Sequence, residues 1–86
     1  MESLDAMIDL LSDGQWHSIN EVSTLKPLQH LTMTQIQMML NLLIEYDFVE
    51  VNQRPGYDLT SLIVEAKINP RMLEFWRQIK EVERAP

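Results

Sequence analysis

The residues that could carry out chemistry in this 86-residue chain are few and far apart. Cysteine is absent, which excludes disulfides and thiolate metal sites. The two histidines, His17 and His30, lie on different expected elements, so a metal site would also need carboxylates from elsewhere in the chain. We therefore expect no metal and no cofactor, and we assign both histidines to turn and loop positions.

No set of side chains in the sequence is arranged for catalysis. Carboxylates such as Asp9 and Asp13 fall on an expected exposed surface, with no histidine, cysteine or glycine-rich loop to work with them. Ser18 and Thr32 precede expected helices, where a hydroxyl group commonly caps the first turn, so we interpret them as caps instead of nucleophiles. A chain this short leaves little room for a deep pocket. The sequence predicts a protein that is not an enzyme.

Charge is distributed unevenly along the chain, which has a formal net charge of −6. Residues 1–50 contain eight acidic residues and a single basic one, Lys26. An acidic region of this kind repels phosphate and attracts basic partners.

The chain has no apolar run near the ~20 residues that span a bilayer, and its first residues are acidic where a signal peptide is basic. We therefore expect a cytoplasmic protein without a membrane anchor.

Four helices must position whatever surface this protein uses. Apolar residues at three- and four-residue spacing predict them over residues 4–12, 19–25, 33–46 and 70–84. Thr32 and Gln35 form a capping box at the start of the third helix, because each side chain can bond the backbone N–H of the other. Asn69 followed by Pro70 is an equally clear start signal for the last helix.

Short strands complete the expected fold. Residues 15–18 suit a short edge strand, and residues 48–52 and 57–60 alternate in polarity as the two arms of a hairpin. A type II turn over residues 54–57 would join the arms, with Pro55 and Gly56 at its central positions. Residues 61–68 could extend a strand or begin a helix, and we favour a helix. The predicted class is mainly α with a small β-hairpin, that is, α+β.

A family resemblance follows from this order of elements. It is carried by residues 11–18, by Glu21 and Val22, by the long helix that runs into residues 46–50, and by residues 56–60. These features resemble the winged-helix variant of the helix-turn-helix fold found in small archaeal and bacterial transcription regulators. The resemblance implies a winged-helix domain over residues 3–61 and a C-terminal helical extension over residues 62–86.

The resemblance also implies a surface that contacts double-stranded DNA, with the helix 33–46 in the major groove and the wing on the backbone or minor groove. Glutamine and asparagine can bond adenine through two hydrogen bonds. The candidate nucleic-acid-binding residues are Thr34, Gln35, Gln37, Met38 and Asn41 on the helix, Lys26 before it, and Arg54 in the wing. On this basis we rank a DNA-associated, transcription-regulator-like function first.

Local charge favours a different partner. The outward stripe of the helix has no lysine or arginine, although about half or more of protein–DNA hydrogen bonds go to phosphate and sugar. In the alternative interpretation Gln35 is only a cap partner, Gln37 and Asn41 are solvated, and Met38 belongs to an adaptable protein-binding surface. The alternative function is an acidic winged-helix module for protein–protein interaction that does not bind DNA directly.

An apolar stripe on the last helix predicts a homodimer. Its members are Met72, Phe75, Trp76, Ile79 and Val82. Aromatic residues and methionine are enriched at protein interfaces. A chain this short also buries only ~60% of its unfolded surface, so a second copy would add core area. The alternative is that the stripe folds back onto the first helix of its own chain.

Overall fold

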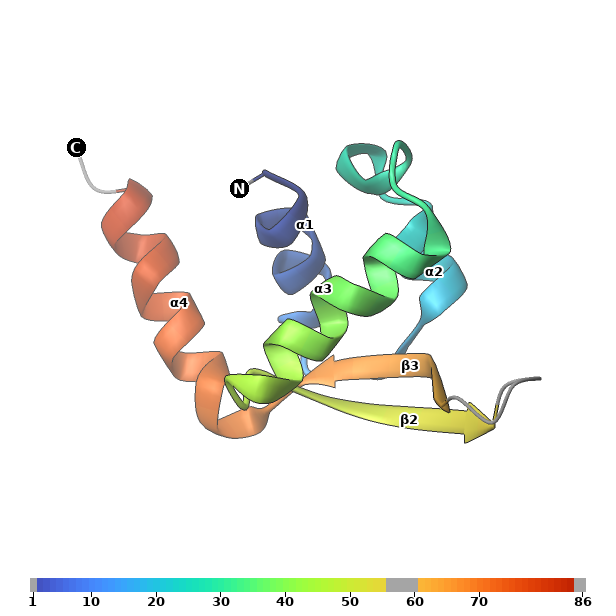
Figure 1. The fold of residues 1–86 in the computed structure, drawn as a ribbon. Coiled ribbons are helices and arrows are strands. Elements are labelled where there is room, and N and C mark those ends of the chain that lie inside the picture. Colours follow the sequence, from blue (N-terminus) through green and yellow to red (C-terminus); the bar gives the residue numbers. More distant parts are fainter. Residues whose placement is uncertain (1, 56–60, 85–86) are drawn as a thin grey trace.

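The computed structural model describes residues 2–55 and 61–84, which form a mixed α+β domain (Figure 1). The elements in chain order are α1 (Glu2–Leu11), β1 (His17–Ser18), α2 (Ile19–Ser23), the 3₁₀ helix η1 (Lys26–Leu28), α3 (Met33–Glu45), β2 (Val49–Pro55), β3 (Ser61–Ile68) and α4 (Pro70–Arg84). The α+β class is thereby confirmed. Each predicted helix ends within two residues of its observed bounds.

The sheet has three antiparallel strands in the order β1-β3-β2, so the last strand of the chain lies at its centre. β3 pairs with β2 from Ile68 opposite Val49 to Ser61 opposite Pro55, and with β1 at Ala66 opposite His17. The helix favoured for residues 61–68 was therefore wrong. Pairing along the length of β2 supplies these residues with backbone hydrogen bonds that a helix would otherwise have to provide.

The hairpin is longer than the sequence suggested. Arg54 and Pro55 lie in β2, opposite Leu62 and Ser61, so the expected turn at 54–57 begins inside a strand. Gly56 and the expected arm over residues 57–60 lie outside the described residues. The boundary expected between residues 61 and 62 falls within β3, and residues 62–68 belong to the sheet instead of to a helical extension.

The caps at both ends of α3 explain where this helix starts and stops. The Oγ1 of Thr32 accepts from the backbone N–H of Gln35, and the Oε1 of Gln35 accepts from the N–H of Thr32 at 2.8 Å, which confirms the capping box. At the other end, Asp47 adopts a left-handed conformation with φ 59°, which aspartate tolerates better than most residues. The N–H of Phe48 then bonds the carbonyl of Leu43, which ends the helix in a Schellman motif.

Asn69 joins the end of α3 to the start of α4. This residue is buried, its Oδ1 accepts from the N–H of Arg71, and its Nδ2 donates to the carbonyl of Asp47 at 3.0 Å. Its own N–H bonds the carbonyl of Phe48 at 2.8 Å. The predicted N-cap at Asn69 is confirmed, and the same side chain fixes where α4 leaves the domain.

The core lies between the sheet and the helices α1, α2 and α3, which cover one side of the sheet (Figure 1). Its members are Met7, Ile8, Leu11, Val22, Leu28, Ile36, Leu40, Leu43, Val49, Ile63, Ala66, Ile68 and Trp76.

The domain is elongated, with a radius of gyration of 13.2 Å against about 12 Å for a compact domain of this length. None of the helices in the described ranges is both long and apolar enough to cross a membrane.

Candidate binding face on α3 and the hairpin

The helix α3 is apolar on two opposite sides. Ile36, Leu40 and Leu43 lie on the inner side and are buried. Met38, Leu42 and Tyr46, spaced four residues apart, form a row on the outer side, where they are 61%, 56% and 74% exposed. We call these three residues the outer row. A folded domain gains nothing for its own core from such a row, so it is a candidate contact surface.

Polar residues expected to read DNA flank the outer row. Thr34, Gln35 and Asn41 are exposed on α3, as the sequence predicted, although the side-chain oxygen of Gln35 is engaged in the capping box. Lys26 is exposed on η1 and Arg54 is exposed near the end of β2. These two cations therefore come from elements on either side of α3 in the sequence and not from α3 itself.

Gln37 is used inside the fold. Its Nε2 donates to the carbonyl of Ile63 at 2.9 Å, and its Oε1 accepts from the N–H of Ile63 at 3.0 Å. β1 pairs with β3 only opposite Glu65 and Ala66, so the Gln37 amide takes the place of a strand further along this edge. The amide that was expected to contact a base therefore bonds Ile63 through both of its polar atoms.

The charge that α3 itself carries is acidic. Glu45 is exposed at the end of α3, and the α3 sequence has no lysine or arginine. The carboxylates that follow α3 pair with nearby cations: Asp47 with Arg71, and Glu50 with the Nζ of Lys67 at 3.4 Å. Arg71 and Lys67 are therefore already paired with carboxylates of this domain. These two ion pairs add no net charge to the face, so its charge on α3 comes from Glu45 alone, which gives a polyanion no attraction there.

The apolar stripe of α4 is divided between the core and the surface. Trp76 is buried, its Nε1 donates to Oδ1 of Asp9 on α1 at 2.9 Å, and its ring meets that of Phe48 edge-on at 6.4 Å. Met72 and Ile79 are half-buried against the core. For these residues the stripe folds back on its own chain, which was the alternative expectation.

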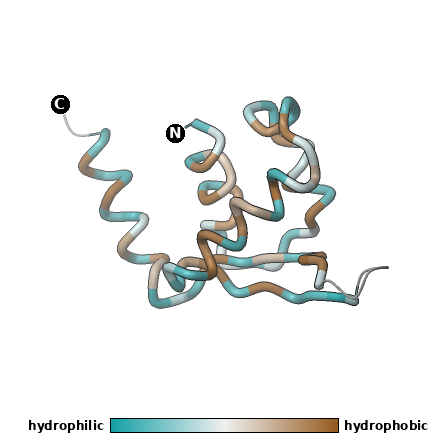
Figure 2. Tube along the Cα trace, in the orientation of Figure 1, coloured by the Kyte–Doolittle hydropathy of each residue, from teal (hydrophilic) through white to brown (hydrophobic). Residues whose placement is uncertain are grey.

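The other half of the stripe remains open. Phe75 is 49% exposed and Val82 is 76% exposed, and with Ile79 they line a shallow apolar depression along α4. Figure 2 shows hydrophobic and hydrophilic positions alternating along the whole of this helix. Of the five residues predicted at a dimer interface, Phe75 and Val82 are thus presented to solvent, and Trp76 is not.

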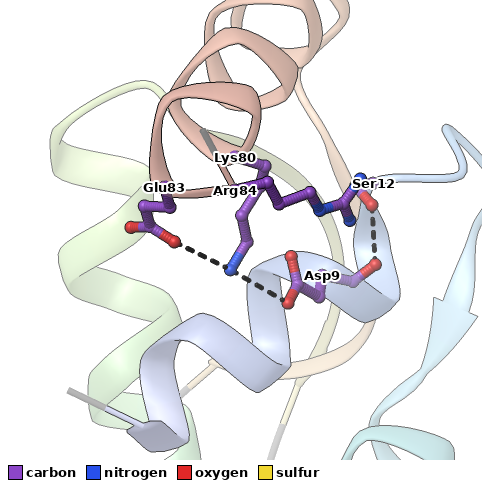
Figure 3. Close-up of a pocket in the computed structure, with 5 residues that line it drawn as sticks. All are labelled: Asp9, Ser12, Lys80, Glu83 and Arg84. Atoms are coloured by element: carbon purple, nitrogen blue, oxygen red, sulfur yellow. Dashed lines mark hydrogen bonds and ion pairs between the residues drawn. The ribbon is translucent and has the colours of Figure 1, made fainter. Parts of the chain in front are cut away.

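A second group of polar side chains lies where α4 passes α1. Asp9, Ser12, Lys80, Glu83 and Arg84 line this pocket (Figure 3). Lys80 Nζ lies 3.3 Å from Asp9 and 3.6 Å from Glu83, and the Oγ of Ser12 donates to the carbonyl of Asp9. The charges in this pocket neutralise one another, and the geometry provides no base for the Ser12 hydroxyl. We interpret the group as a junction between two helices.

His17 is the residue that the sequence interpretation missed. Its side chain is buried in β1, with Nδ1 2.6 Å from Oε2 of Glu21 and Nε2 2.9 Å from Oδ1 of Asp13. The assignment of His17 to a turn was therefore wrong, whereas the short edge strand expected over residues 15–18 is present at His17 and Ser18. Carboxylates four positions before and four after a histidine were a usable signal, but they span a turn, a strand and a helix start, so helical spacing did not reveal them.

Across residues 2–55 and 61–84, no cluster of three or more histidine or acidic side chains is suited to hold a metal ion.

No known family model matches the chain, and no curated protein matches it significantly. Its function therefore has to be inferred from the geometry and chemistry of the described residues.

Proposed function

We propose that this chain is a cytoplasmic winged-helix module without catalytic activity that acts in regulation through the outer side of α3. The order α1-β1-α2-α3-β2-β3 and the strand order β1-β3-β2 support the proposal. So does the position of α3, which follows a short helix and a turn and leads directly into a hairpin. Winged helices serve both as DNA readers and as protein-docking modules, so the partner must be argued from the surface.

The partner that the surface favours is a protein segment with apolar side chains flanked by lysine or arginine. The observation that carries this choice is the outer row, in which Met38, Leu42 and Tyr46 are all more than half exposed. Methionine and tyrosine suit adaptable protein interfaces. Glu45 on the same helix, in a helix sequence without lysine or arginine, provides the complementary charge for a basic partner.

A peptide selection tests the proposed protein contact directly. Peptides displayed on phage are selected on the immobilised chain and then compared on two variants, Leu42→Glu and Val82→Glu. Both changes place a carboxylate at an exposed apolar position, but only the first lies in the outer row. We expect the recovered peptides to combine apolar residues with lysine or arginine, to lose binding to Leu42→Glu and to keep binding to Val82→Glu. Peptides that are acidic, or that bind both variants as well as the wild type, would contradict the proposal.

Direct binding to duplex DNA is a second candidate, and it remains the function that the family resemblance favours. Thr34, Gln35 and Asn41 are exposed on α3 and could contact base edges, while Lys26 and Arg54 could each contact a phosphate. Two cations provide weak anchoring, because phosphate contacts dominate affinity for DNA. Gln37 was also expected to read adenine, but its amide bonds the backbone of Ile63 inside the fold.

A titration with a mixed pool of duplexes at low salt decides between the candidates, because non-specific attraction is strongest there. If DNA is the partner, Lys26→Ala and Arg54→Ala should each weaken binding, while Arg77→Ala, which removes an equal charge from the exposed side of α4, should not. If the partner is a protein, we expect no binding at micromolar concentrations by wild type or variants. Binding that all three substitutions weaken equally would indicate attraction to charge alone.

We further propose that the exposed half of the α4 stripe joins two copies of the chain. Phe75, Ile79 and Val82 support this part of the proposal, and Trp76 does not, because its ring is buried in its own domain. The small size of the domain gives a second copy a stabilising role.

A further inference from the structure

The ring of His17 lies between two carboxylates that come from different parts of the fold. Asp13 belongs to the turn after α1, where its Oδ1 also accepts from the N–H of Gln15 at 2.8 Å. Glu21 lies in the first turn of α2, whose N-cap Ser18 accepts from the N–H of Glu21. His17 itself is in β1. One buried side chain therefore connects the end of α1, the edge of the sheet and α2.

This geometry favours a protonated ring. A neutral imidazole has one N–H group and can donate to one acceptor, whereas an imidazolium donates from both nitrogens. Both ring nitrogens of His17 lie within 3 Å of a carboxylate oxygen, and the Nε2 is 2.9 Å and 3.0 Å from the two oxygens of Asp13. Loss of the proton would leave a ring lone pair facing a carboxylate on one side.

The electrostatic balance agrees with this geometry. Burial disfavours the charged ring and lowers the pKa of His17, but the hydrogen bonds to Asp13 and then Glu21 outweigh it, so the pKa lies above 6.5. The hydrogen bond from the Gln15 backbone, followed by the one from His17, holds the pKa of Asp13 below 3.8. The paired, charged state is therefore the stable one across the range between these two values.

β3 is the strand that packs beside His17. β1 packs against β3, where Ala66 lies opposite His17. The charged neighbours of Ala66 on β3 are Glu65, which accepts from the neutral Asn52 and keeps its charge, and Lys67, which pairs with Glu50 and lies 5.1 Å from the ring centre of Trp16. The groups that raise the pKa of His17 are Asp13 and Glu21, through hydrogen bonds and through charge.

We propose that His17 acts as a proton-dependent clamp that holds α2 against the turn after α1 while the ring is charged, and that loosens α2 when the ring loses its proton. Because η1 and the turn into α3 directly follow α2, deprotonation acts on the N-terminal end of the α3 face. The clamp operates whichever partner that face binds.

The sign of the pH effect follows from linkage. A group whose pKa is raised by folding contributes stability that is fully present below its unfolded pKa of about 6.5 and is lost as the pH rises through the folded value. His17 therefore stabilises the fold at mildly acidic pH and stops doing so at alkaline pH. Asp13 behaves in the opposite way, because its contribution is lost only below pH 3.8, as the pH falls through its lowered pKa.

An NMR titration of the histidine ring protons tests the charge state. In the wild type we expect the midpoint of His17 to lie above pH 6.5. Glu21→Gln and Asp13→Asn should each move it to lower pH, since each replaces a carboxylate with a neutral amide. His30 is exposed on the loop before α3 and outside this cluster, so its ring signals must be assigned separately from those of His17. A His17 midpoint at or below 6.5, or one that neither variant moves, would overturn the proposal.

Amide hydrogen exchange tests whether deprotonation loosens α2. The N–H groups of Thr24 and Leu25 bond the carbonyls of Glu21 and Val22, so they report on α2, and the N–H of Leu40 reports on α3. After correction for intrinsic exchange, protection at Thr24 and Leu25 should fall between pH 6 and pH 9 while protection at Leu40 changes less. In Glu21→Gln the two residues should be poorly protected at both pH values. A parallel loss of protection at all three residues would show that no local clamp exists.

Discussion

α3 and α4 both contain apolar residues beyond those that pack into the core, but the extra residues lie in different places on the two helices. Both are amphipathic helices with a strong start signal and more apolar residues than one contact surface needs. In α3 the excess lies on the side opposite the core, whereas in α4 a single stripe is divided, with Trp76 buried and Phe75 half exposed beside it. Periodicity therefore identifies apolar faces, but neighbouring elements decide which of those faces are covered.

The largest effect that distinguishes the two halves of the α4 stripe is expected at Trp76. Trp76→Ala should lower the free energy of unfolding by about 3–5 kcal/mol, since it removes a buried ring and its hydrogen bond to Asp9. Phe75→Ala should cost clearly less, because about half of that side chain is already in water. Urea denaturation of both variants measures the difference. Equal losses would mean that the stripe is not divided in the way described.

A medium effect is expected on α3, where Gln37 and Asn41 were predicted to share one role. Gln37→Ala leaves the N–H and carbonyl of Ile63 without their partner, and should cost about 1–3 kcal/mol in urea denaturation. Asn41→Ala changes an exposed side chain and should stay within about 0.5 kcal/mol. A Gln37→Ala variant of unchanged stability would return this residue to the candidate contact surface.

The smallest effect on stability is expected at the exposed end of the stripe. Val82→Glu should change the unfolding free energy of the monomer little, because Val82 is 76% exposed, and Phe75→Glu should cost more, because about half of that side chain is buried. Both should dissociate a dimer formed through α4. Sedimentation at high micromolar concentration gives the mass of wild type and variants. A wild type that sediments as a monomer, or a dimer that survives both substitutions, would remove the proposed role of this surface. Met38→Glu is the matched substitution on α3 and should leave that dimer intact.

The parts of the fold that could be predicted are those with local causes. Thr32 with Gln35 and Asn69 with Pro70 each set a helix start through nearby backbone groups. Residues 61–68 could not be assigned in this way, because an apolar run such as Leu62 to Val64 suits either a strand or a helix. Its choice depends on β2, whose residues are up to 19 positions away at the paired ends.

The candidate site was predictable only where exposure follows from helical spacing. Thr34, Gln35 and Asn41 are exposed as expected. Gln37 lies next to them on the helix, but it contacts Ile63, which is 26 positions away, so its role depended on the position of β3. The partners of His17, in contrast, are close in sequence. Asp13 lies in a turn and Glu21 in a helix, so they reach the ring only because the turn, β1 and α2 meet there.

The hydrogen bonds of Asn69 have a mechanical consequence for α4. A helix of 15 residues is about 22 Å long, so a tilt of about 10° at its root would displace its far end by roughly 4 Å. Asn69 stands at that root and is bonded to the turn after α3. In a pair of chains joined through α4, the spacing and relative orientation of the two outer rows would therefore depend on the angle at which the Asn69 amide holds the start of α4.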